Sequence, residues 1–306
     1  RLGKAVEKGD ADGLRTLLAE VPREALGDTD GQHGSTVLHL AVRQCIARCI
    51  EVVELLVEAM TERQISIKDK GESTALHTLL GLLFGRLPTR FTASWLPRVE
   101  AIVNTMTAKS HTAALCTASN SSPQKPLELL CALQQYSAVE IALDKLEDTD
   151  SLDGCLAQGL FMMAVFGKKL PGRVASGSAG TETTLHRLLD YAKEDELLRN
   201  RAVGYRLVMQ SYPLSVIVRV LESQREMDLP PMDPVGVNVL HGIATMGNEA
   251  LLESVMPYVT PDMMAQRSRD GKTPRDQATS TYAWTNREVY QRLAALLQTH
   301  VKSAVE

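Results

Sequence analysis

The dipeptide Leu-His occurs four times in this chain, behind residues that favour the start of a helix. The copies are Leu38-His39, Leu76-His77, Leu185-His186 and Leu240-His241. Before the first copy, Gly34 permits a tight turn, and the Thr36 hydroxyl can accept a hydrogen bond from an amide of the first helical turn. A helix-start signal that recurs along a chain is typical of repeat proteins, in which each unit packs only against its neighbours. This repetition predicts a solenoid.

The first copy belongs to a unit of two helices. Leu38 and Ala41 share one helical face, and the small Ala41 lets a neighbouring helix approach closely. Residues 51–57 follow with apolar residues at helical spacing, which predicts the second helix of the pair. The combination of Thr-x-Leu-His with a later Glu-Val-Val-x-Leu-Leu resembles the ankyrin repeat.

Other segments resemble this unit to different degrees. Residues 2–18 and 240–256 fit it, with Gly9 and Gly247 in the turn between the two helices. Taking the threonine-equivalent positions as 36, 74, 125, 183, 238 and 273, successive units start 38, 51, 58, 55 and 35 residues apart. Regular ankyrin units repeat every ~33 residues. We therefore expect an all-α ankyrin-repeat solenoid with long insertions and degenerate central repeats.

The spacing divides the chain into three segments. We expect N-terminal ankyrin repeats at 1–150, an irregular helix plus a Gly/Ser-rich loop insertion at 151–182, and C-terminal ankyrin repeats with a cap at 183–306. Residues 152–166 and 202–223 are predicted helices that lack the turn phrase. The glycines between 168 and 180 do not match a phosphate-binding loop, because no strand is predicted before them and the last one is not followed by a lysine and then a serine or threonine.

Composition narrows the possible partners and the compartment. The net charge of −4 gives no basic surplus for nucleic acid, and no apolar run approaches the ~20 residues needed to cross a bilayer. Five cysteines without a short disulfide framework indicate reduced thiols and an intracellular protein, either cytoplasmic or, for a secreted effector, in the host cytoplasm. Because the chain begins with Arg1, we expect it to be a fragment of a longer protein.

We predict no catalytic residues, no metal site and no cofactor. The resemblance to ankyrin repeats implies that the four histidines are structural and hydrogen-bond the backbone of neighbouring turns, and residues one repeat apart cannot converge on one ion. Cys45 and Cys49 share a helical face but have no second pair to complete a zinc site. No small-molecule substrate is evident, and the usual hydrolase motifs are absent from the sequence.

Two kinds of segment are candidates for binding a partner protein. The insertion at 84–95 carries arginines and large aromatic residues, which are enriched at interface hot spots, and its predicted contact residues are Arg86, Arg90, Phe91 and Trp95. The alternative is that its aromatic residues only cover the distorted stack. Ankyrin proteins bind partners with the tips of their turns, which by resemblance selects Lys68, Lys70, Met232, Asp233, Arg267 and Arg269.

The predicted function is that of a protein–protein interaction module, which binds a partner through its turns, concave face and insertions. Irregular ankyrin arrays also occur in bacterial effectors, so an alternative is the substrate-recruiting half of a larger enzyme whose catalytic domain is absent from this chain. A third possibility is catalysis within 152–180, by Cys155 or by nearby acids such as Asp148, Asp150 and Asp153. The scaffold does not decide among these functions.

Overall fold

The computed structural model describes residues 1–45, 49–85, 95–119, 124–149, 154–166, 179–192, 203–226, 236–285 and 287–303. In these residues the protein is all-α and contains no β-strand, and Thr29 and Thr36 form an isolated β-bridge. They divide into two compact units, a first unit within 1–149 and a second unit within 154–303. Cys45, which was considered above as half of a zinc-binding pair, is described only as the last residue of a helix. Asp150 and Asp153, which were considered as catalytic acids, lie outside the described residues.

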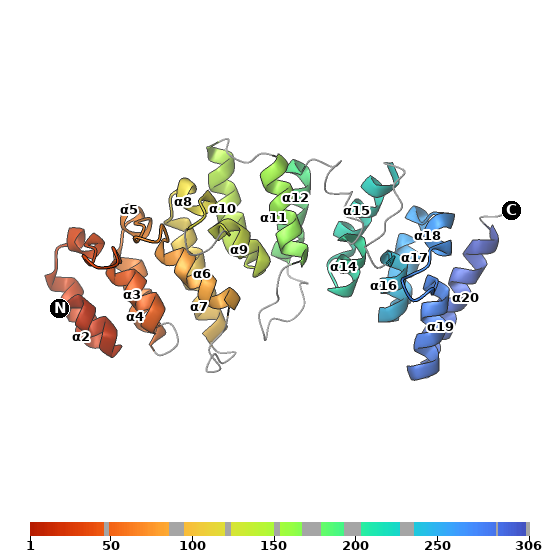
Figure 1. Cartoon of the computed structure of the whole chain (residues 1–306), viewed down its shortest axis with the longest axis horizontal. Helices are drawn as coiled ribbons and strands as arrows, with labels where there is room; N and C mark the ends of the chain where they lie inside the picture. Colours follow the sequence, from red (N-terminus) through yellow and green to blue (C-terminus); the bar gives the residue numbers. More distant parts are fainter. Residues whose placement is uncertain are drawn as a thin grey trace. The chain divides into compact units, whose positions relative to one another are not determined.

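The first unit consists of helix pairs stacked in two rows (Figure 1). The first row contains α1 (Leu2–Lys8), α3 (Val37–Cys45), α6 (Ala75–Gly85) and α9 (Pro126–Ala132). The second row contains α2 (Ala11–Glu20), α4 (Ile50–Ala59), α7 (Leu96–Ala108) and α10 (Tyr136–Asp148). Shorter helices, η1 (Arg23–Gly27), α5 (Glu62–Ile65) and α8 (Thr112–Cys116), lie between the pairs in sequence. Each helix packs against its partner and against the next helix of its own row.

The second unit has the same arrangement of two rows. One row contains α11 (Gly154–Phe166), α14 (Val203–Met209), α16 (Val239–Met246) and α19 (Pro274–Thr285). The other contains α12 (Ala179–Tyr191), α15 (Leu214–Glu226), α17 (Glu249–Val255) with η3 (Met256–Tyr258), and α20 (Glu288–Ser303). The short α18 (Pro261–Ala265) precedes α19. The predicted insertion at 151–182 thus contributes a paired helix, α11, to the second unit.

Four turns inside helix pairs, among those that the structure describes, contain a left-handed residue. Gly9 between α1 and α2 and Gly247 between α16 and α17 have φ of 69° and 70°, which confirms their predicted place in these turns. Gln134 and Ser211 take the same conformation in the α9–α10 and α14–α15 turns. The left-handed residue ends the first helix and lets the chain reverse into the second.

The core of each unit lies between the rows and is aliphatic. Leu38 and Ala41 on α3 are fully buried, as their shared helical face predicts, and so are Val52, Val53 and Leu56 on α4. Small residues in the first-row helices allow close packing with neighbours on both sides. None of the described helices is long and apolar enough to span a membrane.

One copy of the Leu-His signal does not start a helix. Leu185-His186 lies in the middle of α12, which begins at Ala179 and occupies the second row. Thr183 is already inside the helix, so its hydroxyl does not face the free amides of a first turn and cannot cap them. The expectation that this phrase opens the first helix of a C-terminal repeat is wrong. In this unit α11 and α14, which lack the phrase, take the first-row positions.

Candidate partner-binding surface

Three of the four repeated histidines join one turn to the next. The Thr36 N–H donates to Nδ1 of His39 at 3.2 Å, and Nε2 of His39 lies 2.9 Å from the carbonyl oxygen of Ser73 in the following turn. His77 makes the same pair of contacts, with the Thr74 N–H at 3.1 Å and the Thr117 carbonyl at 2.8 Å. Both rings are buried.

The third such histidine, His241, follows the pattern with one change of residue. Asn238 replaces the threonine, and its N–H donates to Nδ1 of His241 at 3.2 Å while Nε2 lies 3.0 Å from the Lys272 carbonyl. In His39 and His77 Nδ1 accepts, so the ring proton sits on Nε2 and is donated to a backbone carbonyl. The predicted structural role of His39, His77 and His241 is confirmed.

Burial keeps two of these rings neutral. Loss of hydration lowers the pKa of His39 and His77 below the ordinary value, and this effect outweighs the hydrogen bonds to the Ser73 and Thr117 carbonyls, which act in the opposite direction. Both nitrogens of each ring are already engaged, which leaves no lone pair for a metal. Among the described residues no group of three or more His, Cys, Asp or Glu side chains could hold a metal ion.

Lowering the pH from 7.5 to 5.5 is expected to lower the free energy of unfolding. An unfolded histidine gains a proton near pH ~6.5, whereas His39 and His77 in the fold do so only at lower pH. The unfolded state therefore binds more protons in this window, and stability that is present above pH ~6.5 is lost as the pH falls towards the folded pKa. The loss at pH 5.5 is at most about 1.4 kcal/mol for each histidine. Urea unfolding at both pH values measures it.

The control for this experiment is the double variant His39→Gln/His77→Gln. It removes both titrating rings, so its stability should change less between the two pH values. Asp30 and Asp276 do not interfere, because backbone hydrogen bonds lower their pKa below the ordinary value of ~3.9, and the stability they add is lost only in more acidic solution. If stability falls equally with pH in the wild type and in the double variant, His39 and His77 are not the cause of the loss.

The fourth histidine, His186, belongs to a polar cluster between α12 and α15. Its Nε2 lies 3.0 Å from Oγ of Ser215, and the Ser215 hydroxyl donates to Glu182. Arg219 donates to Nδ1 at 3.4 Å and pairs with Asp190 at 2.6 Å. Here the histidine contacts side chains, so its predicted contact with a turn backbone is wrong.

This cluster contains the residue types of a serine hydrolase, but they are not hydrogen-bonded in the order that a catalytic triad requires. A nucleophilic serine must give its proton to the histidine, whereas Ser215 gives it to Glu182. A triad also needs a carboxylate at the other ring nitrogen, and that position is taken by the Arg219 guanidinium. The thiols of Cys116 and Cys131 are poor nucleophiles, because burial raises their pKa. The side chain of Cys155 lies outside the described residues.

The predicted binding residues Lys68 and Lys70 lie in the turn before α6. The Lys70 N–H donates to the His33 carbonyl at 2.9 Å, and its ammonium donates to the carbonyls of Gly31 and Gln32, each at 2.9 Å. Lys70 therefore holds its own turn against the preceding one. Lys68 forms an ion pair with Glu72 at 3.2 Å.

The predicted residues Arg267 and Arg269 lie in the corresponding turn before α19. The Arg267 side chain donates to the Gly271 carbonyl at 2.6 Å and lies 3.9 Å from Asp276, so it also stabilises its turn. Arg269 is exposed, and its side chain forms no hydrogen bond or ion pair with a described residue. These arginines belong to the second unit, and the two lysines belong to the first.

The insertion candidates are only partly described. Arg86, Arg90 and Phe91 lie outside the described residues, as do Met232 and Asp233. Trp95 is half-buried and immediately precedes α7. The structure therefore locates five of the ten predicted binding residues, Lys68, Lys70, Trp95, Arg267 and Arg269.

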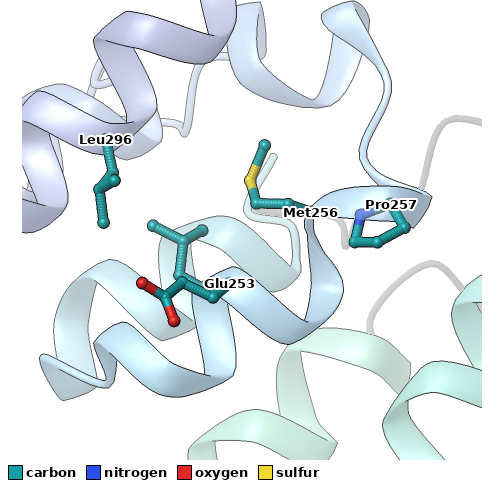
Figure 2. A pocket seen from close by; sticks show the side chains of 5 residues that line it. Glu253, Met256, Pro257 and Leu296 are labelled. Atoms are coloured by element: carbon teal, nitrogen blue, oxygen red, sulfur yellow. The ribbon is translucent and has the colours of Figure 1, made fainter.

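An apolar pocket in the second unit was not predicted from the sequence. It has a volume of about 400 Å³ and is lined by Leu252, Glu253, Met256, Pro257 and Leu296. Figure 2 shows four of these residues, Glu253 of α17, Met256 and Pro257 of η3, and Leu296 of α20. Leucine and methionine at helical spacing indicate an ordinary buried face, so no sequence signal distinguishes this pocket from the core.

No protein-family model matches this chain, and a search of the curated proteins finds no match.

Proposed function

We propose that the chain is an irregular ankyrin-repeat solenoid. Three features support this proposal: the two rows of paired helices, the left-handed residue within the pairs, and the histidines that reach from one turn to the next. The fourth Leu-His copy does not contribute. The longer stretches of sequence lie inside helix pairs, between α6 and α7 and between α11 and α12, as well as between pairs, from α12 to α14 and from α15 to α16.

We further propose that it binds a partner protein with its turns. The observation that carries this proposal is the linkage of consecutive turns, in which His39 reaches Ser73 and Lys70 reaches His33. Linked turns present exposed side chains at fixed positions, and a rigid surface loses less entropy when it binds. Lys68 and Lys70 of the first unit and Arg267 and Arg269 of the second unit are the charged side chains we assign to partner contact.

Removing these charges should weaken capture of the partner. With the wild-type chain as bait in a cell lysate, the variants Lys68→Ala/Lys70→Ala and Arg267→Ala/Arg269→Ala are expected to lose a partner that the wild type retains. A contact residue at an interface centre contributes about 1 kcal/mol or more, or about fivefold in affinity. Quantitative mass spectrometry of the retained proteins measures the loss.

The matched control is Arg15→Ala/Arg98→Ala. Arg15 and Arg98 lie on the second-row helices α2 and α7, and each is an exposed member of an ion pair with α4. The control removes the same charge as each turn variant but leaves the turns intact. The proposal fails if the wild type retains no stoichiometric partner, or if the control loses the partner as completely as both turn variants do.

A further inference from the structure

The pocket between α17, η3 and α20 combines an apolar wall with a carboxylate at its edge. Leu252, Met256, Pro257 and Leu296 provide the apolar surface, and Glu253 is the one charged residue among the described side chains that line the pocket. The exposed Glu253 side chain forms no ion pair or hydrogen bond with another described residue. Figure 2 shows Glu253 among the side chains that line the pocket.

The surroundings of the pocket are acidic. Glu222 of α15 accepts a hydrogen bond from Tyr258, which directly follows Pro257. Arg292 of α20 lies 3.0 Å from Glu249 and 4.0 Å from Glu288, so its charge is already matched by two carboxylates. These three glutamates together with Glu253 carry four negative charges against the one positive charge of Arg292. The described charges around the pocket therefore favour a cationic ligand.

We propose that this pocket receives a bulky apolar side chain of a partner protein, flanked by lysine or arginine. A volume of about 400 Å³ lies in the range of pockets that hold ligands. The apolar side chain displaces water from Met256 and Leu296, and the neighbouring cation pairs with Glu253. The inference rests on the proposed protein-binding function, but it assigns the binding to the second-row helices α17 and α20 rather than to the turns.

Three blocked peptides titrated into the whole chain test this proposal. The probe is Gly-Lys-Trp-Lys-Gly, and the comparison peptides are Gly-Glu-Trp-Glu-Gly and Gly-Lys-Gly-Lys-Gly. The chain carries a ¹³C label in its methionine methyl groups, and the Met256 signal is assigned with Met256→Leu. A saturable shift of the Met256 signal by the first peptide alone is the expected result. A saturable shift by either comparison peptide, or by none of the three, overturns the proposal.

A pair of charge variants then identifies the carboxylate. Glu253→Gln should weaken binding of the probe about two- to fivefold, the range of an exposed ion pair. Glu288→Gln, an equal change of charge on α20 outside the lining, should weaken it less. Equal effects of the two variants would contradict a direct pairing with Glu253.

The experiments distinguish a partner protein from a second copy of the chain as the occupant, and they test the pocket and the turns separately. If the Met256 signal shifts with protein concentration in the absence of peptide, the occupant is a second copy of the chain, and the proposal fails. If the peptides do not bind while the turn variants still lose their partner, only the pocket inference fails. If the probe binds while the turn variants retain their partner, only the proposed role of the turns fails.

Discussion

Replacing His39 with alanine is expected to lower the free energy of unfolding by about 4 kcal/mol, because two buried backbone groups lose their partners at about 1–3 kcal/mol each and a cavity remains. The groups are the Thr36 N–H and the Ser73 carbonyl, which belong to successive turns. His39 itself is fully buried. Urea unfolding monitored by circular dichroism measures the loss, which should fall on the transition of the first unit if the two units unfold separately.

The same substitution at His186 provides the comparison. This ring is 30% exposed, and its contacts are to Ser215, Arg219 and Glu182 on the surface of the second unit. Because water can replace these contacts, His186→Ala is expected to cost less than about 1 kcal/mol. Similar losses for His39→Ala and His186→Ala would show that the backbone contact between turns does not stabilise the fold.

Local signals in the sequence were sufficient to predict the regular part of the fold. Gly9 and Gly247 mark turns inside helix pairs, because a left-handed residue is needed there and glycine adopts it without strain. The burial of Leu38 and Ala41 follows from their spacing on one helix. Each of these predictions depends only on residues within one helix and its adjoining turn.

Predictions that depended on contacts between helices far apart in the sequence were less complete. The phrase at Thr183 is chemically similar to the one at Thr36, but α12 starts earlier and packs against α15, so tertiary packing decides where the helix begins. Gln134 and Ser211 adopt a conformation that usually favours glycine, and their identity gives no signal for it. The pocket beside Met256 exists because α17 and α20 meet in space, and no local pattern contains that contact.

Replacing Gly236 with alanine is expected to lower the free energy of unfolding by about 3 kcal/mol, from backbone strain and a steric clash together. Gly236 has a φ of 77°, and a Cβ atom on it would lie 2.8 Å from the backbone carbonyl oxygen of Arg267 in the next turn. The clash is with main chain, which cannot move aside as a flexible side chain can. The Gly236 carbonyl also accepts a hydrogen bond from Gln266 at 2.6 Å, which fixes the two turns together.

Gly271→Ala separates the two contributions. Gly271 has a similar φ of 74°, but a Cβ atom there would have no neighbouring atom within 4 Å. Only the strain of the left-handed conformation applies, at about 1–2 kcal/mol. The difference between the two alanine variants in urea unfolding therefore measures the close approach of successive turns. Equal losses would mean that the turns before α16 and α19 separate readily, and that a rigid row of turns is not available to a partner in this unit.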